Sequence, residues 1–126
     1  MTAKLDPLLL DVLIALHEAC VRCEEAAAQT NLEKLESEVF SQLAIAKAVE
    51  QIGEISHRVL RRYPSFAEAH SDIPFRYAFQ LRNRIAHGYE TLDWAVLWEI
   101  AVRRVPEFRL MLEPYLAEDS ETHSEL

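Results

Sequence analysis

Long apolar runs and cysteine are both scarce in this chain of 126 residues. The longest apolar stretch, LLLDVLIAL at 8–16, is too short to cross a bilayer and is interrupted by Asp11. It lacks a basic segment beyond Lys4 and a small-residue cleavage site, so we expect no signal peptide and no membrane association. The two cysteines, Cys20 and Cys23, lie about one helical turn apart, which disfavours a framework disulfide. Reduced thiols in a cytoplasmic protein are the expectation.

Basic residues are outnumbered: 13 Lys and Arg face 21 Asp and Glu, giving a formal net charge of −8. This balance excludes nonspecific binding of nucleic acid through overall charge, so a role with RNA requires a local basic patch. Six arginines could form one: Arg58, Arg61, Arg62, Arg76, Arg82 and Arg84. Half of the residues are hydrophobic, as in a globular protein. We expect one helical domain over 1–116 and a disordered acidic tail over 117–126.

Strand signals are absent too, with no alternating run and no Asn-Gly hairpin turn. Helical signals replace them. Asp6-Pro7 predicts the cap and first residue of a helix that runs to about Gln29. Its first half is apolar nearly all round, so a second subunit could cover one side. Spacings of three, four and seven predict another helix within 32–62, which Tyr63-Pro64 ends.

The second half of the chain continues the pattern after a connector at 64–72 that has room for one short helical turn. Ser71 or Asp72 is expected to cap a third helix, and Gly88 to end it in a left-handed conformation. Asp93 is expected to cap a fourth helix, with a kink or break at Pro106 because proline lacks the N–H group. The prediction is an all-α antiparallel bundle of four to five helices.

The segment LRNRIAHGYE at 81–90 concentrates residues suited to phosphodiester chemistry. The fork of Arg82 matches phosphate oxygens, and His87 can exchange a proton near neutral pH. RNA supplies its own nucleophile, the 2′-hydroxyl, so no metal is required. Five residues separate the two side chains by about 140° on a helix. They can cooperate only if the helix ends at His87 or if a second subunit contributes. The alternative is an ordinary surface Arg and His at a helix end.

The motif Arg82-Asn83-Arg84-Ile85-Ala86-His87-Gly88-Tyr89 reads as R-x4-H-x-Y, with Asn directly after the Arg. It resembles the signature of the HepT-like toxins in the HEPN superfamily (higher eukaryotes and prokaryotes nucleotide-binding). Upstream, AVEQIGEISHRVLRRYP resembles the family's IGE helix and the Tyr-Pro pair that follows it. Downstream, 92–98 resembles the helix after the motif. The resemblance covers roughly residues 35 to 116.

This resemblance implies a HEPN-like homodimer with its cleft at the dimer interface. The implied activity is that of a metal-independent endoribonuclease, the toxin of a type VII (HEPN/MNT) toxin–antitoxin system, which cleaves cellular tRNA or mRNA without a cofactor. Arg82, His87 and Asn83 would be the catalytic residues. The implied partner is an MNT-type nucleotidyltransferase antitoxin that uses ATP to transfer AMP to Tyr89. The added phosphate charge beside His87 would repel RNA and block the cleft.

Two competing classes of function remain open. A non-catalytic module could use the same helix end to bind a nucleotide or a nucleotidyltransferase, and would not need both Arg82 and His87. The chain could also be the protective component of the pair, which the intact motif disfavours.

Three further patterns carry weaker hypotheses. Gly53 inside a helix predicts close helix crossing, while the adjacent Glu54 could instead support the site by orienting Arg82 or Arg84. His17, Cys20 and Cys23 carry potential zinc ligands, but they fan around one helix and lack a fourth ligand. Regular helical spacing favours core positions over a base-stacking surface for three aromatic residues: Trp94, Trp98 and Phe108.

Overall fold

The computed structural model describes residues 5–124. Helices succeed one another along this part of the chain, and it contains no strand, which confirms the all-α prediction. The elements are α1 (Pro7–Ala28), α2 (Leu32–Ser37), α3 (Val39–Arg62), α4 (Pro64–Ala69), α5 (Phe75–His87), the 3₁₀ turn η1 (Tyr89–Thr91), α6 (Trp94–Glu99), the π turn η2 (Ile100–Arg104) and α7 (Val105–Ser124). None of the helices within residues 5–124 has the length and hydropathy that spanning a bilayer requires.

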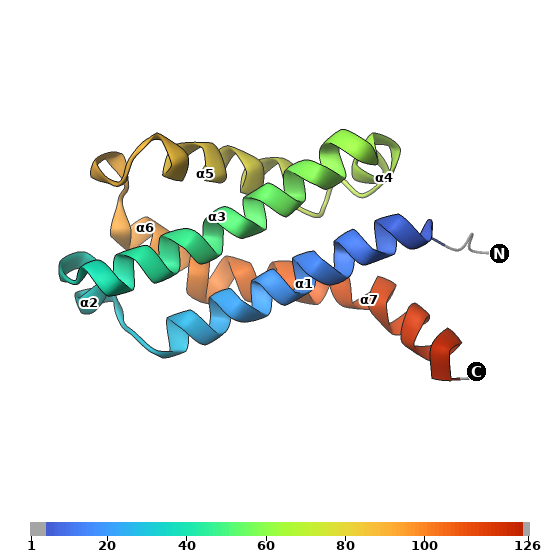
Figure 1. The fold of residues 1–126 in the computed structure, drawn as a ribbon, viewed down its shortest axis with the longest axis horizontal. Coiled ribbons are helices and arrows are strands. Elements are labelled where there is room, and N and C mark those ends of the chain that lie inside the picture. The colour runs from blue at the N-terminus through green and yellow to red at the C-terminus, as the bar shows by residue number, and fades with distance from the viewer. Residues whose placement is uncertain (1–4, 125–126) are drawn as a thin grey trace.

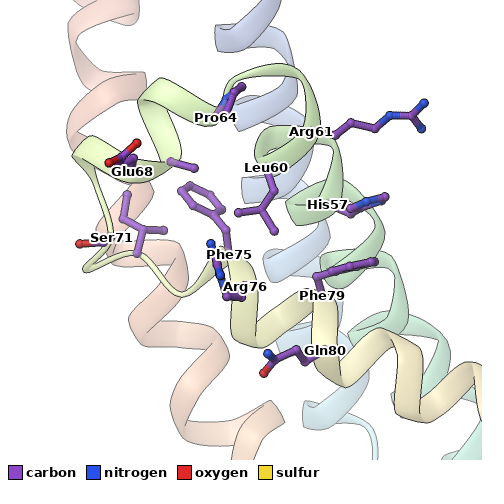
Figure 2. A pocket seen from close by; sticks show the side chains of 12 residues that line it. His57, Leu60, Arg61, Pro64, Glu68, Ser71, Phe75, Arg76, Phe79 and Gln80 are labelled. Atoms are coloured by element: carbon purple, nitrogen blue, oxygen red, sulfur yellow. The ribbon is translucent and has the colours of Figure 1, made fainter.

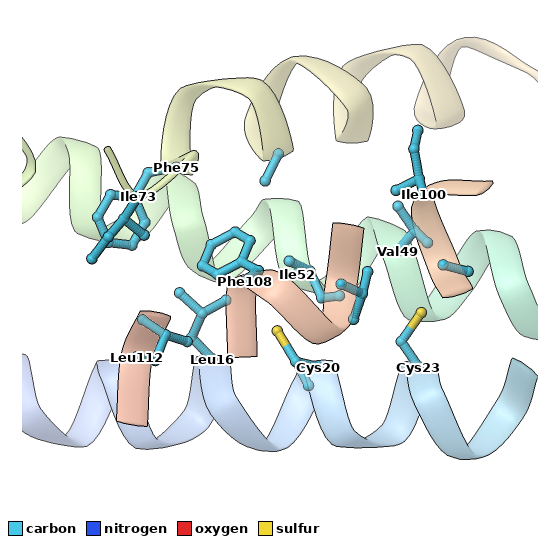
Figure 3. Close-up of a cluster of buried hydrophobic side chains, with 14 of the residues drawn as sticks. Leu16, Cys20, Cys23, Val49, Ile52, Ile73, Phe75, Ile100, Phe108 and Leu112 are labelled. Carbon is cyan, nitrogen blue, oxygen red and sulfur yellow. The ribbon is translucent and has the colours of Figure 1, made fainter. Parts of the chain in front are cut away.

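Helix α3 is the centre of the bundle. It packs against α5 on one side and against α1 on the other, and α7 packs along α1; Figure 1 shows this order. The core between these helices contains buried side chains from each of them, including Leu16, Ile52, Phe75 and Leu112 (Figure 3). Trp94 and Trp98 pack against this core and Phe108 is buried in it, so the prediction that they are core residues is confirmed.

Local sequence signals account for several helix ends. The Asp6 carboxylate accepts a hydrogen bond from the Leu8 N–H at 2.8 Å, and Asp93 accepts from the Ala95 N–H at 3.0 Å. Both caps confirm the predictions, because a short carboxylate satisfies N–H groups that the first helical turn leaves free. Helix α3 ends at Arg62, directly before Tyr63-Pro64, also as predicted.

The predicted helix within 32–62 is two helices, because the backbone at Glu38 is extended (φ −114°, ψ 125°). The break turns α2 onto α6, where Leu35 is completely buried. Burial of a leucine stabilises by about 1.5–3 kcal/mol, and this gain favours the break over one continuous helix.

The predicted cap of α5 at Ser71 or Asp72 is wrong. The helix begins at Phe75, with Pro74 at the cap position and no side-chain cap. A residue before proline avoids the α conformation, so Ile73 cannot start the helix. Ile73 and Phe75 are instead both buried, which holds the connecting turn against the core.

The chain does not break at Pro106. Instead, the irregular segment is the π turn just before it, where the Val105 N–H donates to the Ile100 carbonyl. A π turn shifts the hydrogen-bond register by one residue and is a recognised way for a helix to absorb a local disruption. The backbone of α7 then continues as far as Ser124, which lies inside the predicted acidic tail. The side chains from 118 onward and residues 125–126 lie outside the described part, so the domain boundary stays a prediction.

Candidate active site

Helix α5 ends at His87, as the motif predicted. Gly88 follows with φ 139° and ψ 147°, so the predicted helix end is confirmed, but the predicted left-handed conformation of Gly88 is wrong. The ψ angle differs from the left-handed helical value of about 47° and belongs to a region that only glycine adopts readily. The Gly88 N–H donates to the Ile85 carbonyl at 3.2 Å, and Thr91 Oγ1 donates to the Gly88 carbonyl at 3.2 Å. This tight turn leaves the His87 side chain exposed.

Arg82 is held by side chains from two helices. Its Nε donates to Glu54 Oε1 of α3, and its Nη1 donates to Asn83 Oδ1 at 3.1 Å. The Arg82 side chain is 34% exposed, so its guanidinium remains accessible to a ligand. Glu54 was expected to orient either Arg82 or Arg84, and in the structure it contacts Arg82.

Gly53 makes that contact possible. A Cβ atom on Gly53 would lie 2.5 Å from the Ala78 carbonyl oxygen and also clash with the Arg82 Cβ. Helices α3 and α5 therefore cross with their backbones closer than any other residue would allow. The close crossing predicted for Gly53 is confirmed, and it also brings the adjacent Glu54 within reach of Arg82.

His87 and Arg82 are not brought together within one chain. Helix α5 is regular between them, so the five-residue separation turns the side chains about 140° apart. Arg84 is exposed and forms no ion pair with any side chain of residues 5–117. The half-buried Tyr89 ring contacts Trp94 edge to face, with ring centroids 5.8 Å apart. The structure thus brings Arg82, Asn83 and Glu54 into contact, and places His87 at the end of α5 and Tyr89 on the turn after it.

Unpaired arginines collect on the same two helices. Within residues 5–117, five arginines lack a carboxylate at ion-pair distance, and all lie on the second half of α3 or on α5: Arg58, Arg61, Arg62, Arg76 and Arg84. Elsewhere in that range, each arginine is paired with an acidic side chain: Arg22, Arg103, Arg104 and Arg109. The acidic chain therefore presents local positive charge around Arg82.

The three candidate zinc residues do not converge. His17 Nε2 lies 3.2 Å from Glu113 Oε2 on α7, while Cys20 and Cys23 are completely buried in the core. Burial raises the pKa of both thiols to about 12, which keeps them neutral. No cluster of His, Cys, Asp or Glu in the described residues has a metal-binding arrangement.

Sequence reasoning missed a stacked ring pair next to Arg82. His57 of α3 and Phe79 of α5 stack with centroids 3.9 Å apart and planes inclined by 7°. His57 lies three residues after Glu54, and Phe79 lies three residues before Arg82. The spacing was visible in the sequence, but the pairing depends on how α3 aligns with α5.

Comparison with known proteins assigns the chain to a family. Residues 16–114 match the sequence model of the HepT-like family, described as Ribonuclease HepT-like. The chain belongs to this family. The matched region of this HepT-like protein includes Gly53, Glu54, Arg82 and the turn after α5, so the site lies within the part that defines the family.

Individual relatives agree with this assignment. The chain is 28% identical to "Probable ribonuclease HepT" of Thermococcus cleftensis, over 79% of this chain and 87% of the relative. It is 31% identical to "Putative RNase MJ1380" of Methanocaldococcus jannaschii, over 56% of this chain and 62% of the relative. No solved structure matches.

Proposed function

We propose that this HepT-like protein is an endoribonuclease that cleaves RNA without a metal ion. The observation that carries the proposal is the ion pair between Arg82 and Glu54, formed at the glycine crossing five residues before His87. Family membership and the ribonuclease names of its relatives support the same activity. Unpaired arginines on α3 and α5 supply the local charge that an RNA substrate requires.

The chemistry follows from the residue types. Arg82 binds the phosphate oxygens and stabilises the charge that develops on the phosphorane. A His87 imidazole removes the proton of the 2′-hydroxyl, whose oxygen attacks phosphorus. The P–O5′ bond breaks, and a protonated imidazole returns a proton to the leaving 5′-oxygen. The products are a 2′,3′-cyclic phosphate end and a 5′-hydroxyl end.

Two imidazoles serve this reaction better than one, because base and acid act on opposite oxygens. Within a chain, His87 also faces away from Arg82. A homodimer that brings α5 ends together supplies both groups, and we propose that the cleft lies at such an interface. The exposed position of His87 is compatible with contribution to a site shared by two copies.

We further propose that the protein is the toxin of a type VII pair that cleaves cellular tRNA or mRNA, and that an MNT-type nucleotidyltransferase silences it by transferring AMP from ATP to Tyr89. The Tyr89 hydroxyl has no hydrogen-bond partner among the side chains of residues 5–117, so it needs no internal bond broken before modification. A phosphate there would add negative charge two residues from His87 and oppose RNA binding.

The second candidate function is a non-catalytic nucleotide- or nucleotidyltransferase-binding module. The observation in its favour is the separation of Arg82 from His87 around α5. Docking or modification by such a module could survive the loss of Arg82 and His87.

The deciding experiment incubates RNA with purified protein in EDTA and compares wild type with Arg82→Ala and His87→Ala. We expect wild type to cut RNA and leave 2′,3′-cyclic phosphate ends, and both variants to be inactive with unchanged thermal unfolding. Arg103→Ala is the matched control, because Arg103 is exposed and pairs only with Glu99 on the neighbouring helical turn. No cutting by folded wild type would favour the binding module. Cutting that survives in both site variants would refute the catalytic roles of Arg82 and His87.

A further inference from the structure

A groove of about 950 Å³ opens beside the stacked ring pair, between the end of α3, helix α4 and the first turns of α5. Its lining includes His57, Arg61, Arg76 and Phe79. Figure 2 shows His57 and Phe79 lying one above the other, with Arg61 extending on the same side. None of the motif residues from Arg82 to Tyr89 lines this groove, so the proposed chemistry leaves it without a role.

The groove and Arg82 nevertheless belong to one continuous surface. Helices α3 and α5 are antiparallel, and their contacts follow in order: Glu54 pairs with Arg82, and His57 stacks on Phe79 one turn further along. Arg61 and Arg76 line the groove another turn beyond. Six residues separate Arg82 from Arg76, or about 9 Å along the helix.

The side chains of the groove suit a single nucleic-acid strand. The His57–Phe79 pair is half-buried and flat, so it can extend a stack with an unpaired base. Neither Arg61 nor Arg76 has a carboxylate partner in residues 5–117, which leaves both guanidinium groups available to phosphates. Glu68 contributes the one acidic side chain in the lining, and the two arginines outweigh it.

We propose that this groove is a binding subsite for single-stranded RNA, which holds the nucleotides next to the phosphodiester at Arg82. A base stacks on the His57–Phe79 pair, and Arg61 and Arg76 bind the phosphates that follow. The subsite rests on the proposed ribonuclease activity. It explains how an acidic protein binds RNA: the arginines that contact the phosphates lie together along one surface of α3 and α5.

The test measures binding separately from cleavage. A fluorescent single-stranded oligoribonucleotide is titrated with His87→Ala protein by anisotropy at several salt concentrations. The groove variants in this background are Arg61→Gln with Arg76→Gln, and separately Phe79→Leu, which retains an apolar side chain but loses the ring. The control is Arg103→Gln with Arg104→Gln, which removes two exposed charges from η2.

The slope of log affinity against log salt is negative, and we expect the double groove variant to reduce its magnitude by about 1.4, or about 0.7 for each phosphate that is no longer neutralised. Phe79→Leu should weaken binding about tenfold with little change in the slope, and the η2 control should change neither. With His87 restored, the groove variants should raise KM and leave kcat nearly unchanged. The two arginines are exposed, so their replacement tests the proposal even if Phe79→Leu fails to fold.

Other outcomes overturn the proposal. Groove variants that bind like the η2 control would remove the subsite while leaving the nuclease intact. Variants that change the oligomeric state in sedimentation, but not RNA affinity, would assign the groove to a second copy of the chain. Groove-dependent RNA binding by a wild type that never cleaves would retain the subsite and refute the nuclease, so the two failures can be told apart.

Discussion

Replacing Gly53 with alanine tests whether the close crossing of α3 and α5 positions the site. Alanine favours a helix over glycine by about 1 kcal/mol. Its Cβ, however, would lie 2.5 Å from the Ala78 carbonyl oxygen, whereas ordinary contacts begin near roughly 3.5 Å. The helices must separate by about 1 Å, and overpacking of this kind costs about 1–3 kcal/mol. The obstructing atom belongs to the backbone and cannot rotate away, so we expect an overpacking cost near the upper end of that range. After the gain of about 1 kcal/mol in helix propensity, the free energy of unfolding should fall by about 2 kcal/mol.

The same displacement moves Arg82 relative to Glu54. A shift of about 1 Å in a catalytic group can lower activity about 100-fold, and we expect that loss in kcat on an RNA substrate. Urea unfolding measures the stability, and cleavage in EDTA measures the activity. Ala44→Gly is the matched control: it lies exposed on α3 and should lose about 1 kcal/mol with full activity. Gly53→Ala protein that is more stable and equally active would refute the reasoning.

Three other predictions follow from single contacts. Glu54→Gln should lower kcat without weakening RNA affinity, because it removes the charge that positions Arg82 and also a charge that repels phosphate; unchanged kcat would contradict this. Ser56→Ala should raise the free energy of unfolding by about 1 kcal/mol, since the completely buried Ser56 hydroxyl has no hydrogen-bond partner among the described residues; urea unfolding would show a loss instead if the hydroxyl were bonded. The hydrogen bond from His17, together with Arg109, lowers the pKa of Glu113 below its usual 4.5, so its stabilisation is present above that value and is lost as pH falls through the lower folded pKa. Urea unfolding should be measured between pH 3 and 6, roughly the range in which carboxyl groups titrate. As pH falls, the free energy of unfolding should decline less steeply for Glu113→Gln than for wild type, and identical pH profiles would exclude this contribution.

The site was predictable where its chemistry is local. The R-x4-H-x-Y motif identified Arg82, Asn83, His87 and Tyr89, and Gly88 indicated a helix end at the correct residue. Their catalytic and modification roles remain proposals. The partner of Glu54 was open between Arg82 and Arg84, because both follow from sequence equally well. Only the alignment of α3 with α5 selects Arg82.

The sequence by itself determined the all-α class, the caps at Asp6 and Asp93 and the end of α3 before Pro64, because each depends on a few neighbouring residues. The family motif and the unpaired arginines of α3 and α5 were also visible in the sequence. The tertiary structure decided the break at Glu38, which lets Leu35 become buried against α6. It also decided the stack of His57 on Phe79. These features depend on which side chains become buried against distant helices, and backbone preferences of about 1 kcal/mol per residue yield to burial energies about two or three times larger.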